Sequence, residues 1–123
     1  MNQQEYEDIL LVGKFMGVNN LFPYYFEPNE IAGVYIAEDE TGWIDYVDVG
    51  IDWFAPNSDW NTLKPIIDKC FKELEKLGFD KRYSYSPKLG YAPNIVKLNI
   101  NCTIEQAWEC VINAIKYINK YNV

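Results

Sequence analysis

Three stretches with helix-spaced apolar residues, separated by segments of strand-like alternation, constrain the fold of this chain most strongly. The helical spacing covers residues 2–16, a segment that follows Pro56 and ends near Leu77, and a segment from Ile104 to about Tyr121. Four segments between them have the composition of strands: Ile31–Ala37, Trp43–Phe54, Arg82–Pro87 and Ile95–Cys102. The resulting order, α-β-β-α-β-β-α, predicts an α+β fold in which helices pack on an antiparallel sheet. With 123 residues and no linker-like stretch, residues 1–123 are expected to form a single domain.

Local signals predict where the helices begin and end. Gly17 and Gly78 follow the first two helical stretches and suit left-handed C-terminal caps. Thr103 and Gln106 have the spacing of a capping box at the start of the last helix. Asn57 or Ser58 is expected to cap the middle helix.

Prolines complicate two segments. Pro65 lies within the middle helical pattern, so we expect Trp60–Leu63 to form a separate turn, or the helix to kink. The aromatic segment Leu21–Pro28 contains two prolines and has no clean period. It is expected to be a loop or a ragged sheet edge.

The strand candidates Ile31–Ala37 and Trp43–Phe54 are predicted to form a hairpin, with the acid-rich segment 38–42 as its turn. In the second strand, apolar residues alternate with polar or small ones. This alternation predicts that one face of the strand belongs to the core, through Val47, Val49, Ile51 and Trp53.

The charge of the chain is strongly segregated. The stretch from Phe15 to Leu63 contains no lysine or arginine, whereas the rest of the chain carries a net charge of +2 within the total of −7. The stretch contains nine carboxylates: Glu27, Glu30, Glu38, Asp39, Glu40, Asp45, Asp48, Asp52 and Asp59. Such a surface would attract a protein with a basic surface and repel nucleic acid phosphates.

The residue types exclude several chemistries. The chain has no histidine, which removes Ser-His and Cys-His nucleophile systems and histidine metal sites. The three cysteines, Cys70, Cys102 and Cys110, are too widely spaced for a zinc knuckle and are expected to be buried free thiols. We therefore expect no enzyme activity and no cofactor.

Two kinds of candidate site remain. Asp45, Asp48 and Asp52 could hold a hard cation, but Asp45 points away from the other two in a strand, so we favour solvated carboxylates and predict no metal. The aromatic residues Phe22, Tyr24, Tyr25 and Phe26 form either a recognition patch or a lid on an open end of the core. Tyr83, Tyr85 and Tyr91 present the same choice. The candidate interaction residues are Glu38, Asp39, Glu40, Asp48, Asp52, Tyr24, Tyr25 and Phe26.

Three segments together resemble a known family. They are Ile9–Gly17, which ends in a hydrophobic residue, Met and Gly; Ser58–Ile67, in which Ser and Trp open the middle helix; and Ala107–Asn119, in the last helix. This arrangement is similar to small phage and prophage proteins of the phage ABA sandwich type. The resemblance implies a helix–sheet–helix sandwich and a phage or prophage origin, and it supplies no catalytic residues.

The sequence therefore favours a non-enzymatic binding module that docks a basic partner through its acidic hairpin. Alternatives are an immunity-type inhibitor of a basic toxin and a metal-dependent hydrolase that uses Asp48 and Asp52. No secretion signal and no apolar run of membrane-spanning length are present, so a location in the bacterial cytoplasm is expected. The sequence is also compatible with a homodimer.

Overall fold

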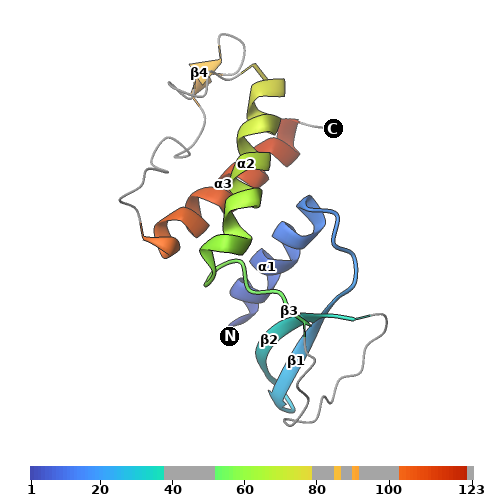
Figure 1. Ribbon diagram of the computed structural model, residues 1–123. Helices are drawn as coiled ribbons and strands as arrows, with labels where there is room; N and C mark the ends of the chain where they lie inside the picture. Colours follow the sequence, from blue (N-terminus) through green and yellow to red (C-terminus); the bar gives the residue numbers. More distant parts are fainter. Residues whose placement is uncertain (38–51, 79–84, 87–89, 92–102, 122–123) are drawn as a thin grey trace. The chain divides into compact units, whose positions relative to one another are not determined.

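The computed structural model describes residues 1–37, 52–78, 85–86, 90–91 and 103–121 (Figure 1). It divides into two compact units, Met1–Ala55 and Pro56–Val123, so the single domain stays a prediction. The described helices and antiparallel strands confirm the α+β class, with an added strand after the first helix. The elements are α1 (Gln3–Phe15), β1 (Leu21–Glu27), β2 (Glu30–Ile36), β3 (Asp52–Trp53), α2 (Trp60–Lys76), β4 (Tyr85–Ser86), β5 (Gly90–Tyr91) and α3 (Ile104–Tyr121).

Helix α1 begins and ends through side-chain and backbone caps. The side-chain oxygen of Asn2 accepts a hydrogen bond from the Glu5 N–H at 2.8 Å. At the other end, Val18 N–H donates to the Gly13 carbonyl at 2.8 Å and Gly17 N–H donates to the Lys14 carbonyl at 3.1 Å. This Schellman arrangement requires a positive φ at Gly17, which is 79°, and it confirms the predicted left-handed cap.

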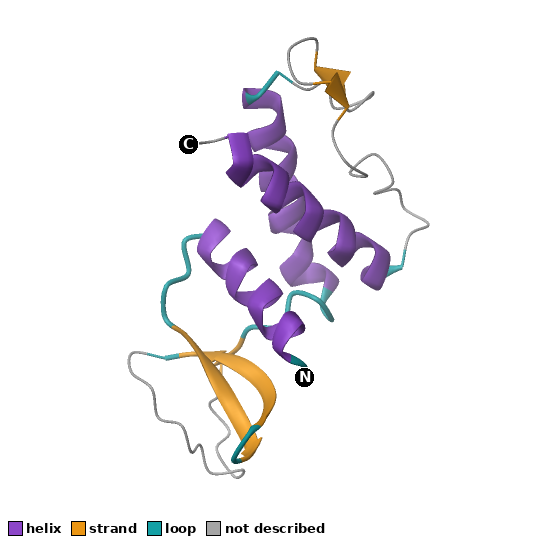
Figure 2. Ribbon diagram, turned by 180° about the vertical axis from the view of Figure 1, so that it is seen from behind, coloured by secondary structure: helices purple, strands orange, loops and turns teal. Residues whose placement is uncertain are grey.

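The aromatic segment forms an edge strand. Strand β1 pairs with β2 in an antiparallel hairpin and lies at one side of the sheet order β1-β2-β3 (Figure 2). The ladder shifts register twice, skipping Ala32 on β2 and then Phe26 on β1. Of the two alternatives for this segment, the ragged edge is therefore confirmed and the loop is wrong. Pro23 is compatible with the strand because an edge position does not need its missing N–H.

Strands β2 and β3 confirm the predicted antiparallel pairing, with Tyr35 opposite Trp53 and Ile36 opposite Asp52. Phe54 N–H continues the ladder by donating to the Val34 carbonyl at 2.9 Å. The predicted turn at 38–42 and the inward residues Val47, Val49 and Ile51 lie outside the described residues.

Helix α1 covers one face of the hairpin β1–β2. Helix α1 packs on the face that carries Leu21, where a side chain at Gly13 would meet Leu21 Cδ1. Pro23 and Val34, which share this face by register, are buried. A side chain at Gly13, in the last turn of α1, would therefore require the end of the Leu21 side chain to move.

Helix α2 differs from the prediction at its start. Its cap is Asp59, not Asn57 or Ser58: one carboxylate oxygen accepts the Asn61 N–H at 3.0 Å and the other accepts the Thr62 hydroxyl at 2.8 Å. Of the two alternatives predicted for Pro65, the separate turn is wrong, because the helix runs through Pro65, and the kink stays a prediction.

The reason for this continuity is burial on both sides of the proline. Pro65 cannot donate to the Asn61 carbonyl, which costs the helix one hydrogen bond. The buried stripe of α2 nevertheless begins before Pro65, at Leu63, and resumes directly after it, at Ile66. Keeping both residues on one face requires a continuous helix.

Helices α2 and α3 pack together (Figure 2). The capping box predicted for α3 is confirmed: Gln106 N–H donates to Thr103 Oγ1 at 3.2 Å, and Thr103 N–H donates to Gln106 Oε1 at 3.0 Å. Eleven side chains of the two helices are buried: Leu63, Ile66, Cys70, Leu74, Ala107, Cys110, Val111, Ile112, Ala114, Ile115 and Ile118.

Two short strands complete the described elements. β4 pairs with β5, with Tyr85 opposite Tyr91, and β4 falls inside the predicted strand Arg82–Pro87. The strand predicted at Ile95–Cys102 lies outside the described residues. The three described helices lack the combination of length and apolar character needed to cross a bilayer.

Candidate functional site

The structure describes the aromatic candidates of the segment 21–28 fully and most of the acidic candidates not at all. Tyr24, Tyr25 and Phe26 lie in β1, and Asp52 contributes its backbone to β3. Glu38, Asp39, Glu40, Asp45, Asp48 and Tyr83 lie outside the described residues. Tyr85 and Tyr91 are placed by their backbones in β4 and β5. The candidate site is therefore built from the hairpin β1–β2 and strand β3.

Four aromatic side chains lie on the sheet face opposite the one that carries Leu21. We call Phe22, Tyr24, Tyr35 and Trp53 the aromatic face. Register places Phe22 opposite Tyr35, with ring centroids 5.9 Å apart. Tyr24 meets Trp53 edge to face, at 5.4 Å between centroids and 82° between ring planes. Each such pair is worth about 0.5–1.5 kcal/mol beyond the burial of its two rings.

Gly33 allows the contact between Tyr24 and Trp53 across the central strand. It lies opposite Tyr24 in the ladder, and the Trp53 ring occupies the space that a side chain at Gly33 would fill. A β-carbon there would lie 2.8 Å from Trp53 Cζ3 and 3.2 Å from Cε3. The missing side chain is therefore what lets Trp53 reach over β2 to the edge strand.

The aromatic face is buried at one position and open at another. Tyr35, in the central strand, is 1% exposed, whereas Trp53 on β3 is 48% exposed. The expectation that Trp53 belongs to the core is therefore wrong. Trp53 shares a face with the buried Tyr35, but its place on the outer side of β2 leaves half of its surface in contact with solvent.

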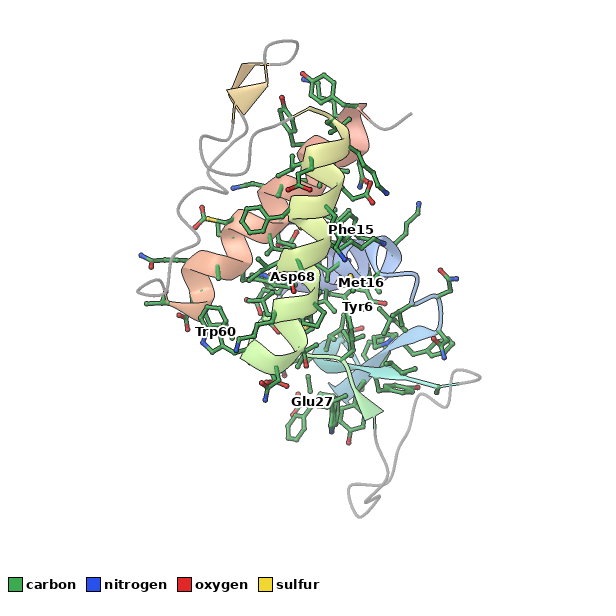
Figure 3. The ribbon with its side chains drawn as sticks, turned by 45° about the horizontal axis from the view of Figure 1, so that its top comes forward. Tyr6, Phe15, Met16, Glu27, Trp60 and Asp68 are labelled. Carbon is green, nitrogen blue, oxygen red and sulfur yellow. The ribbon has the colours of Figure 1, made fainter. Side chains whose placement is uncertain are left out.

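The end of the hairpin carries the most exposed aromatic ring among the described residues. We call residues 26–30 the hairpin tip. Phe26, which the ladder skips, is 70% exposed. Glu27 and Glu30 face each other across the ladder and are both exposed. Figure 3 shows Glu27 at this end of the sheet.

These observations divide the aromatic candidates between the two roles left open by the sequence. Phe22, Tyr24 and Tyr25 are partly buried and belong to the sheet. Phe26 and Trp53, although they lie in strands β1 and β3, expose about half or more of their surface to solvent. Sequence reasoning missed the placement of Trp53 and the pairing of Glu27 with Glu30. The latter had a signal, because Pro28-Asn29 between two apolar runs is a turn sequence that sets these glutamates opposite each other.

The buried thiols fit the prediction of inert cysteines. Cys70 and Cys110 are buried thiols, not joined in a disulfide, in the compact unit Pro56–Val123, which we call the helical unit; Cys102 lies outside the described residues. Burial raises the pKa of the Cys70 thiol from its ordinary value of 9.0 to about 12, against a smaller opposing effect of Lys69. A thiol with such a pKa is a poor nucleophile at neutral pH because the reactive thiolate is almost absent.

Cys70 is therefore expected to resist alkylation in the folded protein. At pH 8 its thiolate fraction should be about a thousandfold below that of an unfolded cysteine, because the pKa is raised by about three units. Iodoacetamide labelling with and without urea, read by peptide mass spectrometry, measures this protection. Labelling of Cys70 at the unfolded rate without urea would contradict it.

The same shift gives a pH dependence of stability. The unfolded chain loses the Cys70 proton near pH 9, while the folded chain keeps it up to about pH 12. The contribution of the protonated Cys70 thiol to the free energy of unfolding is therefore fully present below pH 9 and is lost as the pH rises toward 12. Cys70→Ala should remove this part of the alkaline decline in the free energy of unfolding.

The helical unit has its own aromatic groups. Tyr117 and Tyr121 lie 4.8 Å apart between ring centroids, and Lys120 Nζ is 5.4 Å from the Tyr121 ring. Burial raises the pKa of Tyr117, and Tyr121 adds to this through its charge and a hydrogen bond. Trp60 is 39% exposed at the start of α2 (Figure 3). These groups are ordinary features of helix surfaces and ends.

Comparisons with known proteins give no assignment. The chain matches no model of a protein family, and no curated protein and no solved structure matches it. Within the described ranges, no three Cys, Asp or Glu side chains are grouped so that they could hold a metal ion. The site is therefore interpreted from its own geometry.

Proposed function

We propose that this protein is a non-enzymatic binding module that docks on a basic surface of a partner protein through its acidic stretch, which contains both the hairpin tip and the predicted acidic turn 38–42. The observation that carries the proposal is the hairpin tip, where exposed Phe26 stands beside the opposed carboxylates Glu27 and Glu30. Exposed aromatic rings are frequent anchors of protein interfaces, and the neighbouring charges select the sign of the partner.

The charge around the tip supports this choice of partner. The tip belongs to the stretch Phe15–Leu63, which contains no lysine or arginine that could neutralise its carboxylates. The acidic residues predicted to interact, Glu38, Asp39 and Glu40, belong to the same stretch. An immunity-type inhibitor of a basic toxin is one form that such a module could take. A metal-dependent hydrolase using Asp48 and Asp52 is the weaker alternative.

The proposal includes the origin implied by the family resemblance. A phage or prophage protein with a helix–sheet–helix sandwich, acting in the bacterial cytoplasm, would meet basic host proteins there. The genes beside the coding sequence separate the two forms of the proposal: phage genes favour the general docking module, whereas an adjoining toxin gene favours the inhibitor.

A charge-reversal experiment tests the docking surface. Glu27→Lys/Glu30→Lys is expected to weaken retention on immobilised poly-lysine by about tenfold at low salt, because it replaces attraction with repulsion at the tip. Glu38→Lys/Asp39→Lys/Glu40→Lys should act in the same direction.

The matched control is Asp68→Lys/Glu75→Lys, which changes the net charge equally on exposed positions of α2. It should weaken retention much less. Retention should also fall as salt is raised, since exposed charges are screened over about 10 Å at 0.1 M salt. If the tip and control variants lost retention on poly-lysine equally, net charge alone would determine retention and the proposal would be refuted.

A further inference from the structure

We infer that the partner contributes an extended basic segment, one of whose lysine or arginine side chains stacks on the exposed ring of Trp53 while a neighbouring cation pairs with Glu27 and Glu30. This inference rests on the proposed function and specifies the ligand chemistry of the same surface. It follows from the placement of one ring and two carboxylates in the sheet formed by β1, β2 and β3.

The first step concerns Trp53, which is exposed and at the same time held in place. Half of its surface is open. Its ring nevertheless lies over Gly33 and is met by Tyr24 at 82° between planes. A ring fixed in this way loses little conformational entropy when a ligand binds it, which favours its use as an anchor.

The second step concerns what a tryptophan ring binds in an acidic environment. The indole face attracts a lysine or arginine cation more strongly than a phenylalanine or tyrosine ring does. The stretch that contains Trp53 has no such cation of its own between Phe15 and Leu63. Among the cation–ring contacts of the described residues none involves Trp53, so a cation of a partner would complement this ring.

The third step concerns the opposed glutamates. Glu27 and Glu30 are direct partners across the ladder, where like charges are destabilising. A cation that binds between them would replace this repulsion with two attractions. An arginine guanidinium suits the position because it presents several donors to carboxylate oxygens.

The spacing of the two positions defines the ligand. Glu30 and Gly33, over which the Trp53 ring lies, are three residues apart on β2, a span of at most about 10 Å because the ladder skips Ala32 between them. An extended peptide covers this distance in about three residues. The ligand is therefore a polypeptide segment with two basic residues separated by about three positions.

The negative charge of the chain also disfavours nucleic acid and a second copy of this chain as ligands of this surface. Nucleic acid would bring phosphates to a chain of net charge −7. A second copy of this chain would bring the same carboxylates to the interface. A basic polypeptide is the occupant whose charge complements the surface.

Titration of the full chain with a defined peptide tests the inference. The probe is an acetylated Gly/Ser octapeptide with arginines three positions apart, and its control has citrulline, a neutral isostere, at both positions. NMR follows the Trp53 indole N–H, with the Trp60 indole as an internal reference. The arginine peptide should shift the Trp53 signal, and the citrulline peptide should not.

Variants separate the ring from the charges. Trp53→Met, which keeps an apolar side chain without a ring, should weaken binding of the arginine peptide by about three- to thirtyfold. Trp60→Met, at a comparably exposed tryptophan in α2, should leave the affinity unchanged. Glu27→Gln/Glu30→Gln should weaken binding and reduce its salt dependence.

Other outcomes of the titration separate the inference from the proposed function. Suppose that the arginine peptide binds and that Glu27→Gln/Glu30→Gln weakens its binding. If the Trp53 signal does not shift and Trp53→Met leaves the affinity unchanged, the inference is wrong and the proposed docking function stands. Equal binding of the citrulline peptide would identify a merely apolar surface and overturn the inference. The absence of binding at low salt would also overturn it, and poly-lysine retention then decides the proposed function separately. Because the Trp53 signal is read in the unmodified protein, the test does not depend on the folding of any variant.

Discussion

Replacing Tyr35 by alanine is expected to lower the free energy of unfolding by about 3–5 kcal/mol, the range found when a large buried aromatic ring is truncated. Tyr35 is 1% exposed in the central strand, and its ring lies 5.9 Å from that of Phe22. Truncation would leave a cavity between β1 and β3 at the position opposite Trp53. Urea unfolding followed by circular dichroism measures the change.

The control for Tyr35 is Phe26→Ala in the neighbouring strand. Phe26 is 70% exposed, so its removal should change the stability by no more than about 0.5 kcal/mol. A loss of several kcal/mol for Phe26→Ala would mean that this ring supports the fold, and would remove the main reason to regard it as an interface residue. A loss below 1 kcal/mol for Tyr35→Ala would contradict the assignment of Tyr35 to the core.

Replacing Leu63 by alanine is expected to cost about 2–5 kcal/mol in the other compact unit. Leu63 is completely buried and begins the apolar stripe that α2 shares with the core of the helical unit. It also precedes Pro65, so its contacts are part of what keeps the helix continuous through the proline. The free energy of unfolding from urea titration, with the helical signal at 222 nm, gives the result.

Lys64→Ala is the matched control for Leu63, because Lys64 is the exposed neighbour on the same helical turn. Its effect should stay within about 0.5 kcal/mol. Similar losses in the two variants would show that α2 is stabilised by its own propensity and not by packing against the core.

The two core variants also test the predicted single domain. Tyr35 and Leu63 belong to different compact units of the chain. If the chain unfolds as one domain, each variant should shift one common transition. If each variant shifted a separate transition, the single-domain prediction would be wrong.

Local chemistry allowed the end of α1 and the start of α3 to be predicted closely, whereas the cap of α2 is one or two residues from its predicted position. The cap at Gly17 and the capping box of Thr103 and Gln106 each depend on a few neighbouring residues, and both are present. The errors arose where distant residues decide. Pro65 is a helix breaker by itself, yet burial of Leu63 and Ile66 on one face keeps α2 continuous.

The candidate site was predictable only where it depends on local sequence. The aromatic segment and its acidic surroundings are visible in the sequence, and so Tyr24, Tyr25 and Phe26 could be named. Their division into sheet residues and an exposed ring could not, because it depends on a register that skips Phe26. A register is a relation between two strands, which one strand alone does not contain.

The sequence alone determined the α+β class, the cap at Gly17, the capping box of Thr103 and Gln106, the antiparallel pairing of β2 with β3 and the segregation of charge, because each depends on short-range spacing or on a count of residues. The tertiary structure decided the exposure of Trp53. Alternation assigns Trp53 to the same face as Tyr35, and the ladder confirms this by placing the two residues opposite each other. Only the position of β3 beside the central strand, with Gly33 leaving room for the ring, makes one residue core and the other surface.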